Sequence, residues 1–290
     1  MDFLRPLTWA EALALKAERP EATPIQGGTD VMVEINLDKG RPAALLDLTP
    51  VRDLRDWSRE GGEIRVGAGV TYSRLIAELG ADLPGLAQAS RTVGSPQIRN
   101  RGTVVGNLGA ASPAGDSHPP LLACGGVVEA ESVRGTRLIP IGEFYTGVKR
   151  NALAPDELIR AVRVPAATGP QYFSKIGTRN AMVIAVCSFA VALDPSVRRV
   201  GTGIGSAAPT PRHAPRAEDF AAGELDWDGR GPLDSGVARR FGELVAASAA
   251  PIDDVRGRAA YRTHALAVMA CRALGWAWDD IRAGDRRGSA

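Results

Sequence analysis

The stretch Pro24-Ile25-Gln26-Gly27-Gly28-Thr29-Asp30-Val31 decides the fold, because two glycines stand there between a short apolar run and the start of a helix. Residues 24–26 are predicted as a strand, and Thr29 or Asp30 as the cap of a helix over 31–35. Glycine has no Cβ, so the backbone can approach a bulky anion, and free N–H groups at a helix start favour phosphate. The pattern therefore predicts either a phosphate-binding turn or an ordinary strand–turn–helix junction.

The tract TVVGNLGAASPAGD over residues 103–116 carries a second signal, and it closely follows Gln97-Ile98-Arg99-Asn100. Small residues alternate there with hydroxyl, amide and carboxylate groups. Such a stretch can follow an extended ligand with its backbone and short side chains. Taken alone, it is also compatible with a long surface loop.

The length, composition and net charge limit the classes of protein to which this chain can belong. The chain has 290 residues, enough for one large domain or two ordinary ones, and 44% hydrophobic with 23% charged residues is globular composition. A net charge of +2 gives no electrostatic case for nucleic acid or an acidic membrane surface. The 33 glycines and 20 prolines indicate many tight turns and close backbone approaches.

Cysteine usage and the N-terminus indicate the compartment. Cys124, Cys187 and Cys271 lie far apart, so they form no disulfide framework or zinc motif, and an iron–sulfur cluster normally needs four thiolates. Residues 1–6 lack the basic and then apolar run of a signal peptide. The longest apolar stretch, residues 181–193, is shorter than a membrane span. We expect a cytoplasmic protein with no membrane insertion.

Periodicity divides the chain at the linker over residues 165–170, Pro-Ala-Ala-Thr-Gly-Pro. Before it, helices are predicted over 8–19, 71–79, 86–92 and 119–123, and strands over 44–48, 63–69, 127–131, 138–139 and 157–164. The helix over 8–19 begins at a capping box formed by Thr8 and Glu11. After the linker, strands are predicted over 183–193 and 197–205, and helices over 233–248 and 258–281 with a weak point at Gly275.

Familiar catalytic motifs are absent from the sequence, which has no P-loop, HExxH or GxSxG. Residues 203–208 match the dinucleotide fingerprint GxGxxA, but Pro209 and Pro211 stand where its helix should run. We therefore predict a strand that runs into a turn. His118 is predicted to cap or line a loop, and no metal site is expected.

Together, the two glycine tracts resemble the FAD-binding (medium) subunit of the molybdenum hydroxylases, the family of xanthine dehydrogenase and carbon monoxide dehydrogenase. That family carries a GGT-type segment near residue 30 and the motifs QIRN, TxGGN and SPxxD near residue 100, all found here in order. Residues 175–185 resemble its KxxxRxAxxIA segment. The resemblance implies an α+β fold, with a vanillyl-alcohol-oxidase-type FAD-binding domain of two α/β subdomains over 1–168. A C-terminal domain of carbon monoxide dehydrogenase type, built of a sheet plus helices, would follow over 169–290.

The resemblance also implies a set of cofactor-binding residues. The residues that would wrap the FAD pyrophosphate are Pro24, Ile25, Gln26, Gly27, Gly28, Thr29, Asp30 and Val31. Those of the second phosphate and ribityl wall would be Gly102, Thr103, Gly106 and Asn107. Asp116 would bond the ribityl or ring-edge groups, Ile159 would pack on the isoalloxazine, and Lys175 would bring a cation to the ring. A surface lysine is the alternative for Lys175, and no side chain is expected to act as a catalytic residue.

One position departs from the family pattern, because Val105 replaces the first glycine of TxGGN. A β-branched residue tolerates a positive φ poorly. Either the backbone at Val105 has ordinary dihedral angles, or its contact with FAD is altered.

The resemblance implies that the chain holds FAD noncovalently and passes electrons. A large partner would carry the molybdenum cofactor and a small partner the [2Fe-2S] clusters, in a dimer of heterotrimers. Electrons from the clusters would reach NAD, oxygen or another acceptor through FAD. The alternatives are a free-standing flavin-dependent oxidase or dehydrogenase of the same fold, and a non-enzymatic scaffold subunit. The substrate of the complex and the electron acceptor stay open.

Overall fold

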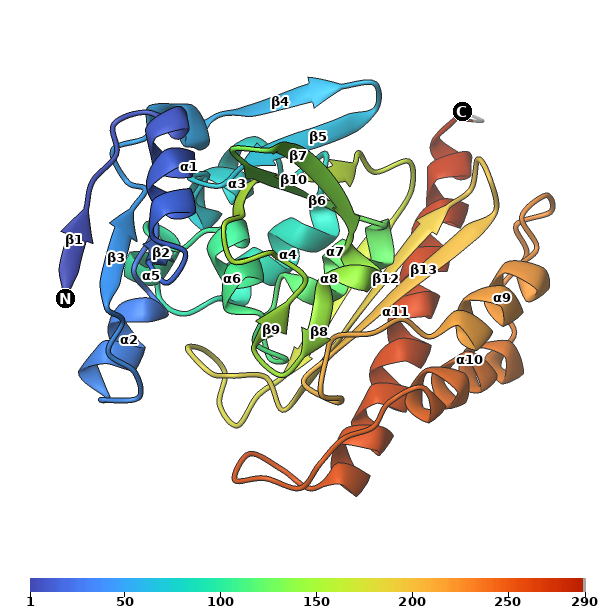
Figure 1. The fold of residues 1–290 in the computed structure, drawn as a ribbon. Helices are drawn as coiled ribbons and strands as arrows, with labels where there is room; N and C mark the ends of the chain where they lie inside the picture. The colour runs from blue at the N-terminus through green and yellow to red at the C-terminus, as the bar shows by residue number, and fades with distance from the viewer. Residues whose placement is uncertain (289–290) are drawn as a thin grey trace.

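The structure is a computed structural model that describes residues 1–288, with side chains described through residue 284. Within that range, the strands form a three-stranded parallel sheet, a five-stranded antiparallel sheet, a three-stranded antiparallel sheet and a two-stranded ribbon (Figure 1). Among the described residues, no helix combines the length and the apolarity that crossing a bilayer requires.

The N-terminal layer is a parallel sheet whose strand order is β1 (Asp2–Leu4), β3 (Ala44–Asp47) and β2 (Thr23–Ile25). Helix α1 (Trp9–Glu18) begins at the predicted capping box, in which Thr8 Oγ1 accepts a hydrogen bond from the Glu11 N–H at 3.2 Å. Helix α2 (Val31–Asn36) starts directly after the Gly27-Gly28 turn. The first glycine tract thus lies at the end of β2, at one edge of this layer.

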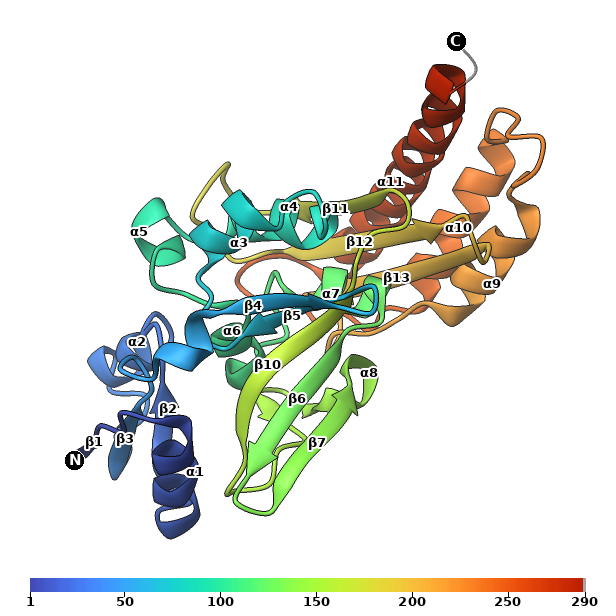
Figure 2. The ribbon, with the colours of Figure 1, turned by 90° about the horizontal axis from the view of Figure 1, so that it is seen from above.

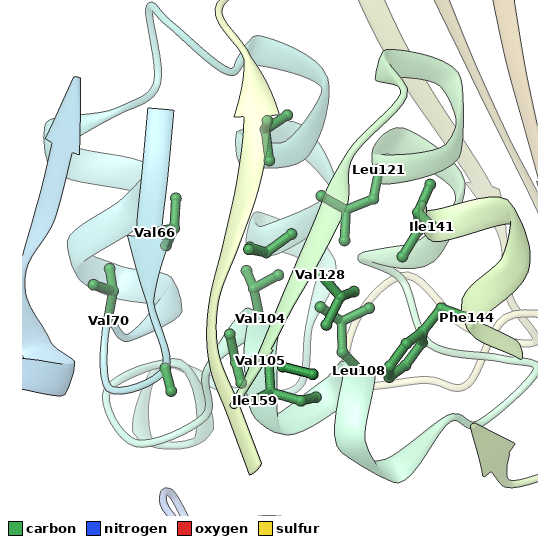
Figure 3. Packing of buried hydrophobic residues seen from close by; sticks show 14 of the residues in the cluster. Val66, Val70, Val104, Val105, Leu108, Leu121, Val128, Ile141, Phe144 and Ile159 are labelled. Atoms are coloured by element: carbon green, nitrogen blue, oxygen red, sulfur yellow. The ribbon is translucent and has the colours of Figure 1, made fainter. Parts of the chain in front are cut away.

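The five-stranded sheet forms the centre of the N-terminal part. Its order is β4 (Trp57–Glu60), β5 (Glu63–Gly67), β10 (Leu158–Pro165), β6 (Val127–Ser132) and β7 (Gly135–Pro140). Helix α6 (Val104–Ala110) and helix α7 (His118–Cys124) contact β10. Figure 3 shows Val104, Val105 and Leu108 of α6 packed toward the strands that carry Val128 and Ile159. This contact fixes the second glycine tract against the sheet.

Short elements connect these layers. They are the 3₁₀ helix η1 (Arg52–Arg55), α3 (Tyr72–Glu78), α4 (Pro84–Thr92), α5 (Pro96–Arg99), α8 (Ile141–Phe144), β8 (Tyr145–Gly147) and β9 (Arg150–Asn151). The helices and strands predicted before residue 165 are confirmed to within a few residues. Helices α5 and α6 were not predicted, because glycines interrupt the helical periodicity of their tract.

The C-terminal part is a sheet between two layers of helices (Figure 2). The sheet has the order β11 (Gln171–Ile176), β12 (Cys187–Asp194) and β13 (Arg199–Gly205). Helices α4 and α7 contact one face, while α9 (Pro215–Glu224) and α11 (Ala259–Gly288) contact the other, with α10 (Ser235–Ala247) against both of these helices. In β12, Ala190 and Ala192 join the N-terminal core, whereas Phe189 and Val191 join the C-terminal core. Because successive side chains of a strand point to opposite faces, this one buried strand contributes to both cores.

Several predictions for this part need correction. The strand predicted over 183–193 begins only at Cys187, and residues 183–186 belong to a loop. Strand β11 and helix α9 were not predicted, because the half-buried β11 sequence lacks a clear alternation and α9 is short and rich in alanine. The rejection of a Rossmann site is confirmed. After β13 the chain runs through Pro209 and Pro211 without a helix until Pro215.

Glycines of β13 let the sheet lie directly on α7. A Cβ at Gly201 would lie 2.0 Å from the Ala123 carbonyl oxygen, and one at Gly203 would lie 2.0 Å from that of Pro119. Neither position has room for a side chain, so backbone packs on backbone at the contact between the two parts.

Gly275 lies within α11, which continues through it without the predicted weak point. A Cβ there would meet no atom within 4 Å, so Gly275→Ala is expected to stabilise the chain by about 1 kcal/mol, measured by urea unfolding. Gly242→Ala is the contrasting control in α10, since its Cβ would lie 2.4 Å from the Ala267 carbonyl oxygen and should destabilise the packing. Equal effects of the two substitutions would contradict this account.

Candidate functional site

The two glycine tracts meet in the structure although they lie far apart in the sequence. A Cβ at Gly27 would lie 2.3 Å from the Arg101 carbonyl oxygen and 3.1 Å from Gly102 Cα. A Cβ at Gly102 would in turn lie 3.3 Å from Thr29 Oγ1. The two loops can approach this closely because Gly27 has no Cβ, and a side chain at Gly102 would be tight as well.

The loops enclose a first cavity of about 310 Å³. The predicted residues that line it are Pro24, Gln26, Gly27, Gly28, Thr29, Asp30, Val31, Gly102, Thr103, Gly106, Asn107 and Asp116. Further lining residues that were not among the predicted set are Tyr72, Val93, Gly94, Ile98, Ser112, Ala114, Gly115, Val183 and Ile184. Val183 and Ile184 belong to the C-terminal part, so both parts of the molecule build the cavity wall.

Local backbone chemistry shapes this wall. Gly28 has φ +76°, a left-handed conformation that favours glycine, and it turns the chain into α2. Thr103 caps α6, because its Oγ1 accepts a hydrogen bond from the Gly106 N–H at 2.8 Å. Val105 lies in the first turn of α6 with a right-handed backbone, and its side chain is buried in the core (Figure 3). Val105 therefore has ordinary backbone dihedral angles, which was the first of the two alternatives for this position.

A buried ion pair stands at the edge of the first cavity. The Lys175 ammonium lies 2.5 Å from Asp116 Oδ2, and the two side chains are only 8% and 7% exposed. The Thr92 hydroxyl donates to the same oxygen at 3.1 Å. Burial raises the pKa of Asp116, while Lys175 and Thr92 oppose that rise. Lys175 is therefore no surface lysine, but it reaches the cavity through Asp116 and does not line it.

Residues 116, 117 and 118 each make a buried side-chain contact beside the first cavity. Beyond the Asp116 ion pair, Ser117 Oγ lies 3.0 Å from the Tyr72 hydroxyl, and His118 Nδ1 lies 2.7 Å from the Tyr145 hydroxyl. A Cβ at Gly115 would lie 2.2 Å from His118 Nε2. His118, the first residue of α7, thus supports the loop 112–116 from behind, in agreement with its prediction as a residue that caps or lines a loop.

Burial lowers the pKa of His118 from 6.5 to about 3. Below pH 6.5 the unfolded chain takes up a proton that the folded chain does not, so stability falls by about 1.4 kcal/mol per pH unit down to the folded pKa. His118→Gln should remove this slope when urea unfolding is compared between about pH 6.5 and pH 4.5. His264, exposed on α11, provides the matched control His264→Gln, which should keep the slope. An unchanged acid slope in His118→Gln would contradict a neutral buried imidazole.

A second cavity of about 500 Å³ adjoins the first. The residues that line both are Pro24, Gln26, Asp30, Val31 and Gly106. Ile159 lines the second cavity with Val105 and Leu48, and it does not line the first. Ile25 lines neither cavity. Its carbonyl oxygen accepts a hydrogen bond from the Leu48 N–H at 2.9 Å, and its side chain packs near Gly28.

Unpaired polar atoms show that the first cavity fits a polar ligand. Gln26 Oε1, Asn107 Oδ1 and Asp116 Oδ1 are buried without a hydrogen-bond partner among the described residues, and all three residues line that cavity. Buried acceptors in native proteins are normally paired. A ligand that brings N–H and O–H donors, as a flavin dinucleotide does, matches this set.

The cysteines among the described residues offer no evidence for thiol chemistry at the first cavity. Cys124, Cys187 and Cys271 are free, and burial raises the pKa of Cys124 to about 12 and that of Cys187 to about 11. Such thiols are poor nucleophiles at neutral pH. Within residues 1–284, no cluster of three or more His, Cys, Asp or Glu could hold a metal ion.

Comparisons with known protein families define the class of this fold. Residues 1–167 match the model of the FAD binding domain in molybdopterin dehydrogenase. Residues 172–277 match the C-terminal domain of the CO dehydrogenase flavoprotein. The chain is therefore a flavoprotein chain of the molybdopterin dehydrogenase class.

Individual relatives narrow the assignment. The chain is 30% identical to a putative xanthine dehydrogenase FAD-binding subunit of Escherichia coli K12, over 92% of each chain. It is 33% identical to the carbon monoxide dehydrogenase medium chain of Afipia carboxidovorans, over 94% of this chain and 95% of that one. Reconstituted CO dehydrogenase from Oligotropha carboxidovorans gives a TM-score of 0.89 at 30% identity, over 97% of this chain and 98% of that one.

The chain belongs to the family of FAD-binding subunits of molybdenum hydroxylases of the xanthine dehydrogenase and carbon monoxide dehydrogenase type. Its relatives are subunits of oxidoreductases. The family resemblance and the mixed α/β fold class predicted from the sequence are confirmed.

Proposed function

We propose that this chain is the electron-transfer subunit of a molybdenum hydroxylase, which accepts electrons from [2Fe-2S] clusters of a small partner and passes them through FAD to NAD, oxygen or another acceptor. The observation that carries the proposal is the meeting of two glycine tracts around one cavity with unpaired buried acceptors. When bound, FAD supplies both one-electron and two-electron redox chemistry.

In this proposal the two halves of the dinucleotide bind in the first and second cavities, and residues of the two glycine tracts contact both. Gly27, Gly28 and Thr29 bind the pyrophosphate, where the backbone can approach phosphate without a Cβ in the way. Thr103, Gly106 and Asn107, with Gly102 beside them, form the opposite wall. The shared lining of the two cavities supports this division, because their common residues would lie between the two halves of FAD.

The residues of the first cavity would hold the flavin ring, and those of the second the adenosine half. The first cavity holds Asp116 and, behind it, the Lys175 cation, so a buried ion pair stands on the ring side. The second cavity offers Val31, Val105 and Ile159 as apolar contacts. In this division Ile159 would contact the adenosine half, whereas the family resemblance implies a contact with the isoalloxazine.

The side chains of the first cavity hold and orient the ring and do not donate protons to a substrate. Asp116 is fixed by Lys175 and Thr92, so its free Oδ1 can accept a hydrogen bond in a constant direction. Burial favours the neutral form of Asp116, and the Lys175 cation counters that effect. The pair thus keeps a cation close to the place where negative charge develops on reduction.

The chain works in a complex with a large molybdenum-cofactor subunit and a small [2Fe-2S] subunit, as a dimer of heterotrimers in the cytoplasm. Relatives named medium chain and medium subunit support a three-subunit organisation. A solved relative is titled as carbon monoxide dehydrogenase that lacks the Mo-pyranopterin moiety of the molybdenum cofactor. Domains of 1–168 and 169–290 are proposed as the structural units of this subunit.

The test is a titration of the flavin-free chain with FAD and with FMN, followed by flavin fluorescence. FAD is expected to bind tightly and noncovalently, and FMN much more weakly because it lacks the adenosine half. Equal affinity for the two flavins would contradict the two-cavity division, and no uptake of either would contradict the function. A flavin adduct in the mass spectrum of the denatured chain would overturn noncovalent binding. Reduction of the isolated flavoprotein by an alcohol or aldehyde would favour a free-standing oxidase.

A further inference from the structure

A third cavity of about 390 Å³ lies behind one wall of the first. Ser112, Ala114 and Ile184 line both cavities, so a single layer of chain separates them. The rest of the lining comes from the ribbon turn at Val148, the segment after β13 and the loop before α11. Figure 1 shows these loops at the same end of the molecule as β8 and β9. The FAD site proposed above does not use this cavity.

The charged groups of the third cavity do not balance. The charged residues in its lining are Asp254, Arg256 and Arg262. Arg262, whose side chain is 5% exposed, pairs with Asp254 Oδ1, and Arg256 Nη1 lies 3.3 Å from Asp254 Oδ2. One carboxylate therefore serves two guanidinium groups, which leaves one positive charge in excess, and the Arg256 side chain that carries it is 41% exposed at the edge of the cavity. An excess positive charge at the edge of a cavity attracts an anion.

Two hydrogen-bonding groups of the same cavity are also unsatisfied. Arg262 Nη1 donates to the Ser206 carbonyl oxygen at 2.8 Å, but Arg262 Nε and Ser206 Oγ are buried without a partner among the described residues. Both residues are more than nine-tenths buried. Ser206 has φ +58°, a conformation that costs energy in a residue other than glycine. An N–H donor, a hydroxyl and an excess positive charge together match an oxyanion.

The rim of the cavity is apolar. Val148, Ile184 and Ile252 line it, and the side chain of each is more than half exposed. Inorganic phosphate would leave these side chains in water, whereas an apolar body attached to the anion would cover them.

We propose that the third cavity binds a small organic anion, with its carboxylate or phosphate on Arg262 and Ser206 and its apolar body against Val148, Ile184 and Ile252. The site goes beyond FAD binding and does not require it. Because Ile184 and the segment 112–114 also line the first cavity, a ligand there would order part of the wall of the flavin site.

The test is calorimetric titration of the flavin-free full-length chain with benzoate, benzamide and inorganic phosphate. Benzoate is expected to bind at least about tenfold more tightly than its neutral analogue benzamide, since a hydrogen bond to a charged group is lost in the amide. Phosphate is expected to bind more weakly than benzoate, and phosphate binding as tight as that of benzoate would overturn the proposal that an apolar body contacts Val148, Ile184 and Ile252. Equal binding of benzoate and benzamide, or binding of neither, would overturn the proposal.

Variants locate the binding within the cavity. Ser206→Gly removes the hydroxyl and suits φ +58°, so this variant should fold while benzoate binding weakens about tenfold. Arg256→Gln removes the excess charge and should weaken benzoate binding, whereas Arg258→Gln, on the same loop but outside the lining, should not. Arg262→Gln should abolish binding, with circular dichroism to confirm folding. Unchanged benzoate affinity in both Ser206→Gly and Arg262→Gln would refute the assignment.

Discussion

Replacing Gly27 by alanine is expected to abolish FAD retention and to destabilise the chain by about 1–3 kcal/mol, the usual range for overpacking. The added Cβ would lie 2.3 Å from the Arg101 carbonyl oxygen and 2.7 Å from its carbonyl carbon. Both atoms are backbone, so no side chain can swing aside. The two glycine tracts must then move apart, and the pyrophosphate loses the wall that closes over it. FAD content after purification and urea unfolding of the flavin-free chain measure the two effects separately.

Two glycine controls make the Gly27 experiment specific. Gly40→Ala, in the same part of the chain, places its Cβ in open space and should leave both FAD content and stability nearly unchanged. Gly28→Ala meets no atom closer than 3.5 Å but must adopt φ +76°, so it should lower stability modestly and weaken FAD binding less than Gly27→Ala. A Gly27→Ala chain that loses stability but binds FAD normally would show that Gly27 serves packing and not the FAD site.

The second large effect is expected for Lys175→Met, which leaves Asp116 buried without its cation. Removing one partner of a buried ion pair typically costs about 3–5 kcal/mol. The loss should be greatest near pH 8. Burial already holds the pKa of Asp116 above its usual value, and removal of Lys175 raises this pKa further. A carboxyl whose folded pKa lies above its unfolded pKa loses stability as the pH rises between the two values, so the variant should regain stability toward pH 5.

The rescue variant tests the cause of this loss. In the double variant Asp116→Asn with Lys175→Met, both charges are removed, and most of the lost stability should return at pH 8. Lys149→Met is the matched control, because Lys149 pairs with Glu34 at an exposed position and should contribute little. A pH-independent loss in Lys175→Met, or no recovery in the double variant, would show that the ammonium acts by packing and not by charge.

Local sequence signals predicted the elements that carry the site. Thr8 and Glu11 form the predicted capping box because the two partners are three residues apart and need no tertiary contact. The turn at Gly27 and Gly28 was predicted for the same reason. Helix α6 was missed, because Gly106 and Gly109 hide its periodicity although Thr103 provides a good cap.

Long-range geometry could not be read from the sequence in the same way. Val183 and Ile184 enter the first cavity from a loop that was predicted as a strand, and Ile159 lines the second cavity because of the way α6 packs on β10. The partner of Lys175 lies 59 residues away, at Asp116. Such positions depend on how sheets and helices pack, which periodicity within one element does not report.

The close packing of β13 on α7 has a consequence for how the first cavity can open. At Gly201 and Gly203 the strand lies on the carbonyl groups of the helix with no side chain between them. A hinge-like opening of the molecule along this seam would separate two buried main-chain surfaces at once. Any opening of the first cavity is therefore expected in the loop over residues 177–186, which contributes Val183 and Ile184 to its lining, and not along this seam.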